Sequence, residues 1–155
     1  MANNEDAESL LTFLIEKGIK PCGLGSRDTL RLEASLPLYG FELSENITPV
    51  EASLTWTITN KNDYLGSKRI NDQLSGKNHK VLKKFIIDSR KIARTETVGI
   101  AGETKGLVTS GNFSPVLNKS IGFILFENKP SHDLIEFDIR GNLIEGNIVN
   151  KRFLS

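Results

Sequence analysis

The sequence predicts an α+β protein in which a helical first half precedes a small antiparallel six-stranded β-barrel or jelly-roll domain. Helix signals end near Gly76, and six short apolar runs separated by turn residues follow. Charge changes at the same place: residues 1–76 hold seven basic and eleven acidic residues, whereas residues 77–155 hold thirteen and eight. We therefore expect two units, residues 1–76 and residues 77–155.

The first helix is expected over Glu5–Lys17, because acidic residues fill its first turn and a lysine its last, as the helix dipole favours. Gly18 is suited to the left-handed conformation that ends such a helix. A second helix is expected over Arg27–Ala34, with Ser26 as its N-cap and Leu30 on its apolar face.

Two further helix signals and one strand signal follow. Thr48-Pro49-Val50-Glu51 is a capping box with proline at the first helical position, which predicts a short helix. Thr55–Thr59 resembles a strand, and its Trp56 is expected in the core, because a single Trp between apolar segments is more often packed than free to stack on a ligand. The last helix is expected over Ser67–Leu74, ended by Gly76.

After Gly76 the pattern is typical of β structure. The expected strands are Val81–Ile87, Glu96–Ile100, Gly106–Ser110, Ile121–Phe126, Leu134–Ile139 and Leu143–Val149. Alternating apolar residues in two of them predict one buried face, made by Phe123, Leu125, Ile135, Phe137 and Ile139.

Composition excludes several classes of protein. The 155 residues carry a net charge of +1, one cysteine and two histidines, so we expect no disulfide framework, no metal and no affinity for polyanions through overall charge. Cys22 is expected to be a buried thiol. The longest apolar runs are too short for a membrane span and the first residues are acidic, so we expect a cytoplasmic protein that does not contact a membrane.

The segment Gly23-Leu24-Gly25-Ser26-Arg27-Asp28 contains the strongest candidate for a binding residue. A cation near a helix N-terminus is unfavourable for the helix, so Arg27 indicates an anionic ligand, unless it pairs with a neighbouring acid such as Asp28. Arg31 and Glu33 lie further along and are expected to be structural. The basic residues between 77 and 94 have no interleaved aromatic side chain apart from Phe85, which favours a solvated face or an acidic protein partner over nucleic acid.

Three stretches together resemble the T-protein of the glycine cleavage system, the folate-dependent aminomethyltransferase. They are residues 18–40 (GIKPCGLGSRDTLRLEASLPLYG), residues 48–56 (TPVEASLTW) and residues 108–115 (VTSGNFSP). Tyr64-Leu65-Gly66 is similar to an aromatic-Ile-Gly motif of the family. The resemblance implies that residues 1–76 are the last, helical part of the folate-binding region and that residues 77–155 are the family's C-terminal barrel.

The resemblance also implies a reaction. The family transfers the methylene carbon from aminomethyl-lipoyl H-protein to tetrahydrofolate and releases ammonia, and Arg27 matches one of its folate-contacting residues. The aspartate that the family uses at its reaction centre would lie before residue 1, so no catalytic residue is assigned. Ser35 and Ser53 stand where the family usually has glycine.

Two hypotheses of different classes remain open. The chain is part of an aminomethyltransferase that uses tetrahydrofolate and lipoylated H-protein, and its pocket is completed by a missing N-terminal half or by self-association. Alternatively, it is a noncatalytic folate-binding or protein-interaction module that reuses the same fold.

Overall fold

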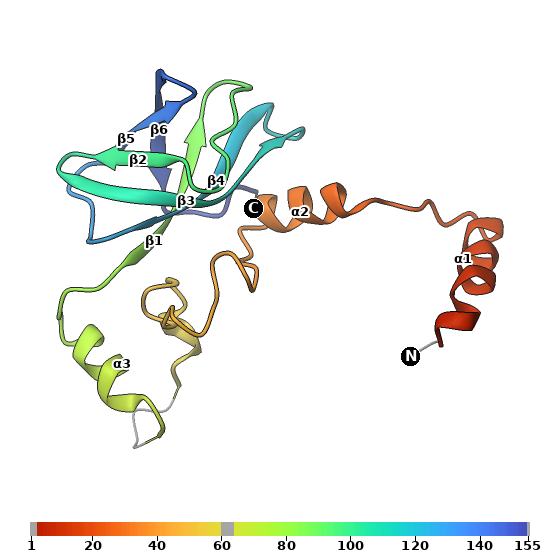
Figure 1. Cartoon of the computed structure of the whole chain (residues 1–155), viewed down its shortest axis with the longest axis horizontal. Coiled ribbons are helices and arrows are strands. Elements are labelled where there is room, and N and C mark those ends of the chain that lie inside the picture. The colour runs from red at the N-terminus through yellow and green to blue at the C-terminus, as the bar shows by residue number, and fades with distance from the viewer. Residues whose placement is uncertain (1–2, 60–63, 155) are drawn as a thin grey trace.

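The computed structural model describes residues 3–59 and 64–154, and it has the expected helical segment followed by a barrel (Figure 1). Within these residues the helices are η1 (Asn4–Asp6), α1 (Ala7–Glu16), α2 (Leu24–Glu33), η2 (Thr55–Thr57) and α3 (Ser67–Leu74). The strands are β1 (Val81–Ile87), β2 (Val98–Ala101), β3 (Thr104–Ser114), β4 (Lys119–Phe126), β5 (Leu134–Ile139) and β6 (Asn142–Val149). The predicted α+β class is confirmed.

The six strands close into an antiparallel barrel in the order β1-β4-β3-β2-β5-β6. β1 closes it by pairing with β4 along its whole length and with β6 over Lys84–Ile86. β3 is longer than predicted and shifts register between Val108 and Ser110, where a bulge lets one long strand follow the curve of the barrel. β2 starts later than predicted because Glu96 adopts a positive φ of 70°, which no regular strand accommodates.

Both faces of β4 are buried, and this corrects the prediction of a single buried face. Ile124 and Phe126 point into the barrel, where they pack with Phe85 and Phe137. Phe123 belongs to a second cluster on the outer surface of the barrel, together with Leu32 of α2. The other buried members of this cluster are Leu82, Ile121 and Phe153. α2 therefore packs on the outside of the barrel through an apolar patch as well as through polar contacts.

α2 begins three residues before the predicted start. Gly23 is its N-cap, and the Ser26 and Arg27 amides both donate to the Gly23 carbonyl, at 3.0 and 3.4 Å. Ser26 therefore lies inside the first turn and does not cap the helix. The predicted apolar face is also wrong: Leu30 is 62% exposed, whereas Leu32 is fully buried against the barrel.

α1 stands apart from the barrel and is joined to α2 by an extended segment (Figure 1). Its large apolar side chains are about half exposed; they are Leu10, Leu11, Phe13 and Ile15. Gly18 ends the helix with a φ of 82°, and the Ile19 amide donates back to the Leu14 carbonyl, as predicted. Cys22 is exposed, so the expectation of a buried thiol is wrong. No helix among residues 3–59 and 64–154 is long and apolar enough to cross a membrane.

Residues 34–54, which follow α2, form turns and loops and no regular helix or strand. The predicted capping box is present, because the Thr48 amide donates to the Glu51 carboxylate at 2.8 Å and the Glu51 amide donates to the Thr48 hydroxyl at 3.2 Å. It caps a single turn and not a longer helix. The predicted strand over Thr55–Thr59 is wrong: Thr55–Thr57 forms a 3₁₀ turn, and Trp56 is 77% exposed and not in the core.

Candidate functional site

A polar network fixes α2 on β3, and Arg31 is its centre. The Arg31 guanidinium donates to the Glu42 carboxylate at 2.7 Å, to the Asp28 carboxylate at 2.8 Å and to the Ser110 hydroxyl at 2.8 Å. Its side chain is only 10% exposed, and that of Glu42 is completely buried. A planar guanidinium can satisfy several acceptors at once, which suits this position between a helix, a loop and a strand.

Glu42 has a full set of partners although it is buried. Besides Arg31, it accepts hydrogen bonds from the Leu38 amide at 2.9 Å and from the Thr109 hydroxyl at 2.7 Å. A buried carboxylate is tolerated only when it is paired and hydrogen-bonded. The loop after α2 is therefore held against β3 by the same network that holds the helix.

Two further contacts extend the network along α2. The Asn112 amide donates to the Thr29 hydroxyl at 3.2 Å and to the Asp28 carboxylate at 3.4 Å. The buried Ser114 hydroxyl donates to the buried Glu33 carboxylate in a short hydrogen bond. α2 is thus anchored at each of its turns after the first. The structural roles predicted for Arg31 and Glu33 are confirmed in this sense, whereas no sequence signal singled out Glu42 or Ser110.

Arg27 lies in the first turn of this fixed helix and is exposed. The alternative that Arg27 pairs with Asp28 is not what the structure shows: within residues 3–59 and 64–154 Asp28 pairs with Arg31, and no ion pair involves Arg27. The guanidinium of Arg27 therefore projects from a rigid support. Within the same ranges no group of three or more His, Cys, Asp or Glu side chains could hold a metal ion.

A four-residue motif, Glu-Ala-Ser-Leu, occurs twice near α2, at residues 33–36 and 51–54. In both copies the serine is left-handed, with a φ of 59° at Ser35 and 57° at Ser53. The leucine amide closes each turn on a carbonyl five residues earlier, at 2.8 Å in both cases. Glycine adopts this conformation freely, whereas a residue with a side chain is strained in it.

Each of these serines uses its hydroxyl to fasten its turn to the barrel domain. Ser53 donates to the Leu82 carbonyl at 2.8 Å, and Ser35 accepts a hydrogen bond from the Phe153 amide at 3.0 Å. Glycine could make neither bond. The two serines therefore combine a strained backbone with side-chain hydrogen bonds that join residues 34–54 to the barrel domain.

Comparison with known protein families divides the chain into two matches. Residues 1–62 match the GCVT N-terminal domain, and residues 80–154 match the glycine cleavage T-protein C-terminal barrel domain. Together with the closed barrel and the attached α2, these matches define a T-protein architecture in which part of the N-terminal domain precedes the barrel.

Individual relatives agree with the family matches. The chain is 42% identical to an aminomethyltransferase of Thermosipho melanesiensis over 142 residues, covering 90% of this chain and 39% of the relative. It is 42% identical to that of Bacillus mycoides over 159 residues, covering 97% and 43%. A crystal structure of the glycine cleavage system aminomethyltransferase T from Bartonella henselae superimposes with a TM-score of 0.81 at 26% identity, covering 96% of this chain and 44% of that one.

The chain belongs to the glycine cleavage T-protein family, the aminomethyltransferases. It spans less than half the length of the curated relatives it matches. The resemblance seen in the sequence is confirmed, including its restriction to part of a T-protein.

Proposed function

We propose that this chain contributes to tetrahydrofolate-dependent aminomethyl transfer, in which a carbon passes from aminomethyl-lipoyl H-protein to tetrahydrofolate and ammonia is released. The observation that carries the proposal is Arg27, an exposed guanidinium on a helix whose later polar side chains, from Asp28 to Glu33, are engaged in the network with β3. In this proposal residues 1–76 are the last part of the folate-binding region and residues 77–155 are its C-terminal barrel domain.

The role assigned to Arg27 is binding, not proton transfer. Its planar fork holds a carboxylate or the polar edge of a pterin through paired hydrogen bonds. The Arg31 network keeps the supporting helix in place, so that little ordering is needed when the ligand binds. No residue of this chain is assigned to the chemical step.

Titration calorimetry with tetrahydrofolate tests this role. Arg27→Ala is expected to weaken binding by about 1.5–3 kcal/mol, the range for a hydrogen bond to a charged group. Arg27→Lys keeps the charge and loses the fork, so an intermediate loss is expected. Arg94→Ala, an exposed arginine on the loop between β1 and β2, is the matched control. Equal affinity of the wild type and Arg27→Ala would remove Arg27 from the folate site.

We also propose that α1 packs against the part of the T-protein fold that this chain does not match. Leu10, Leu11, Phe13 and Ile15 are each about half exposed, a density of apolar surface that indicates an interface. The curated relatives contain more than twice the length matched here, which supplies a partner surface. Self-association through α1 is the alternative, and sedimentation of the chain alone distinguishes the two.

Complementation tests the whole proposal. The chain is mixed with the unmatched portion of the Bacillus mycoides relative, lipoylated H-protein and tetrahydrofolate, and ammonia release is followed. Activity that needs both polypeptides is expected. Salt-sensitive partner binding without any activity or folate affinity would instead favour the noncatalytic interaction module.

A further inference from the structure

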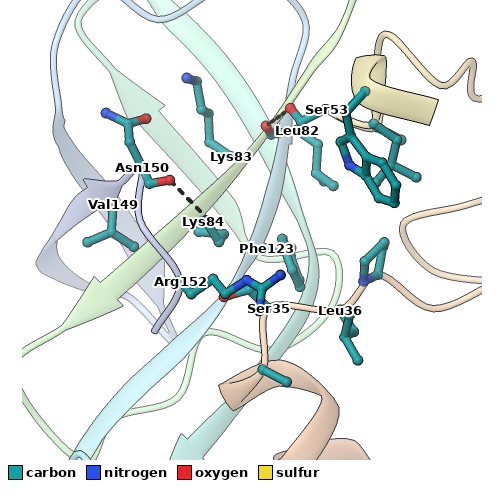
Figure 2. A pocket seen from close by; sticks show the side chains of 15 residues that line it. Ser35, Leu36, Ser53, Leu82, Lys83, Lys84, Phe123, Val149, Asn150 and Arg152 are labelled. Carbon is teal, nitrogen blue, oxygen red and sulfur yellow. Dashed lines mark hydrogen bonds between the residues drawn. The ribbon is translucent and has the colours of Figure 1, made fainter. Parts of the chain in front are cut away.

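A pocket lies on the outer surface of the barrel, next to the C-terminal end of α2 (Figure 2). Its volume is about 390 Å³, and both Glu-Ala-Ser-Leu turns contribute to its wall. Arg27 lies seven residues before Ala34 of the pocket wall, which is about 10 Å along a helix axis, so the pocket is separate from the first turn of α2.

Three cationic side chains line this pocket: Lys83, Lys84 and Arg152. The Lys84 ammonium donates to the Asn150 carbonyl at 3.2 Å, and in Figure 2 the Arg152 side chain reaches toward Ser35. No Asp or Glu is among the lining residues, and within residues 3–59 and 64–154 no ion pair involves any of the three cations. The pocket therefore concentrates positive charge without neutralising it.

The environment of Lys84 shows the cost of this arrangement. Burial lowers the pKa of Lys84 below its ordinary value of 10.5, and repulsion by Arg152 and Lys83 lowers it further. Each of these causes disfavours the charged ammonium. An anion placed between Lys84 and Arg152 would offset the repulsion and favour the charged ammonium.

Most of the other lining residues are apolar, and they include a flat aromatic side chain. Leu36, Leu54 and the buried Phe123 form the lining near the cations. The Trp56 indole also lines the pocket and is 77% exposed, so its face is available to a ligand. A planar apolar group can stack there while a charged group meets the cations.

The pocket is formed without a ligand because its walls are hydrogen-bonded to one another. Ser53 donates to the Leu82 carbonyl of β1 (Figure 2). Ser35 accepts a hydrogen bond from the Phe153 amide after β6. The two left-handed turns are thus fixed to β1, which carries Lys83 and Lys84, and to the C-terminal segment, which carries Arg152. A preformed site requires little ordering of the protein on binding.

We propose that this pocket binds a small organic anion, a carboxylate or phosphate group joined to a flat apolar body. Arg152 and Lys84 hold the anionic group, and Trp56 with Leu36 and Leu54 covers the apolar part. The guanidinium fork of Arg152 matches two oxygens of either anion, and the Lys84 ammonium supplies a second charge.

The experiment is a titration of the chain with 3-phenylpropionate, phenyl phosphate and the neutral 3-phenylpropionamide. Trp56 is the single tryptophan of the sequence, so its fluorescence reports from the pocket itself. We expect saturable binding of at least one anion with a dissociation constant of about 1 mM or tighter. The two anions distinguish carboxylate from phosphate ligands. Binding of the amide as tight as that of both anions, or no change of fluorescence with any probe, would overturn the proposal.

Variants locate the anion within the pocket. Lys84→Gln is expected to weaken binding about tenfold or more, and Arg152→Lys, which keeps the charge but loses the fork, to weaken it severalfold. Lys129→Gln removes the same charge from an exposed residue outside the pocket and is expected to leave affinity within twofold. Equal effects of Lys129→Gln and Lys84→Gln would show that only net charge matters, which contradicts a site.

Thermal unfolding of the ligand-free variants separates a binding role from a structural role. If Lys84 served mainly to stabilise the fold, its removal would lower the Tm. Because Lys84 is held against repulsion and burial, Lys84→Gln is expected to raise Tm while it weakens anion binding. A lower Tm combined with unchanged affinity would assign Lys84 to the structure and overturn its role in the pocket.

Discussion

Arg31→Met removes the centre of the network that holds α2 on the barrel and leaves most of the side-chain volume in place. Glu42, whose side chain is completely buried, loses its ionic partner, while Asp28 is 38% exposed and can be solvated. Breaking a buried ion pair by removal of one partner costs roughly 3–5 kcal/mol. Because Glu42 keeps hydrogen bonds from Leu38 and Thr109, we expect the lower end, about 3 kcal/mol.

Urea unfolding followed by far-ultraviolet circular dichroism measures this loss. The double variant Arg31→Met/Glu42→Gln replaces the buried charge with a neutral amide, so it is expected to recover about 1.5 kcal/mol relative to the sum of the single variants. Glu42→Gln alone is expected to cost less than Arg31→Met, because Arg31 keeps Asp28 as a partner. A loss below about 1 kcal/mol for Arg31→Met, or additivity in the cycle, would refute the view that this pair anchors α2.

Three other predictions concern backbone and titration. Ser53→Gly is expected to be about 1 kcal/mol more stable than Ser53→Ala in urea unfolding, since both lose the hydroxyl and only alanine keeps the strain of a positive φ; equal stabilities would contradict this. Because the pKa of Lys84 is lowered in the folded protein, the unfolded chain binds more protons at pH values between that pKa and 10.5. The Tm of the wild type should therefore rise with pH across this window, and Lys84→Met should reduce the rise. A Tm that falls across the window in the wild type and not in Lys84→Met would contradict this prediction. Gly111→Ala would place a Cβ against the Ala93 carbonyl oxygen and should destabilise the protein by about 1–3 kcal/mol. Gly25→Ala lies in α2 with open space around it and should stabilise the protein by about 0.5–1 kcal/mol. Similar Tm values for the two variants would show that the barrel accommodates the methyl group.

Local signals in the sequence were sufficient to predict the bounds of those helices and strands that have a clear apolar periodicity between start and stop residues. The predicted bounds of α3 (Ser67–Leu74), β1 (Val81–Ile87) and β5 (Leu134–Ile139) are confirmed residue for residue. Gly18 adopts the left-handed conformation expected of it. In each case neighbouring residues along the chain supply the decisive interactions, so their pattern can be read without the fold.

The candidate sites depend on contacts between distant residues, and prediction was correspondingly weaker. Arg27 could be singled out because the chemistry of a helix start is local, although the helix begins earlier, at Leu24. Glu42 was missed, because a carboxylate in a loop gives no signal until Arg31 and Thr109 are brought to it. The pocket was missed for the same reason: Lys84 and Arg152 become neighbours only because β1 pairs with β6.

The sequence by itself therefore determined the α+β class, the strand-rich second half, the family and Arg27 as a candidate residue. Tertiary structure alone decided that Trp56 is exposed, that Phe123 faces outward under α2, and that two Glu-Ala-Ser-Leu turns meet at one pocket. The physical reason is that secondary structure reflects interactions between residues close in the sequence. Burial and the distance between charges depend instead on which strands pair when the barrel closes.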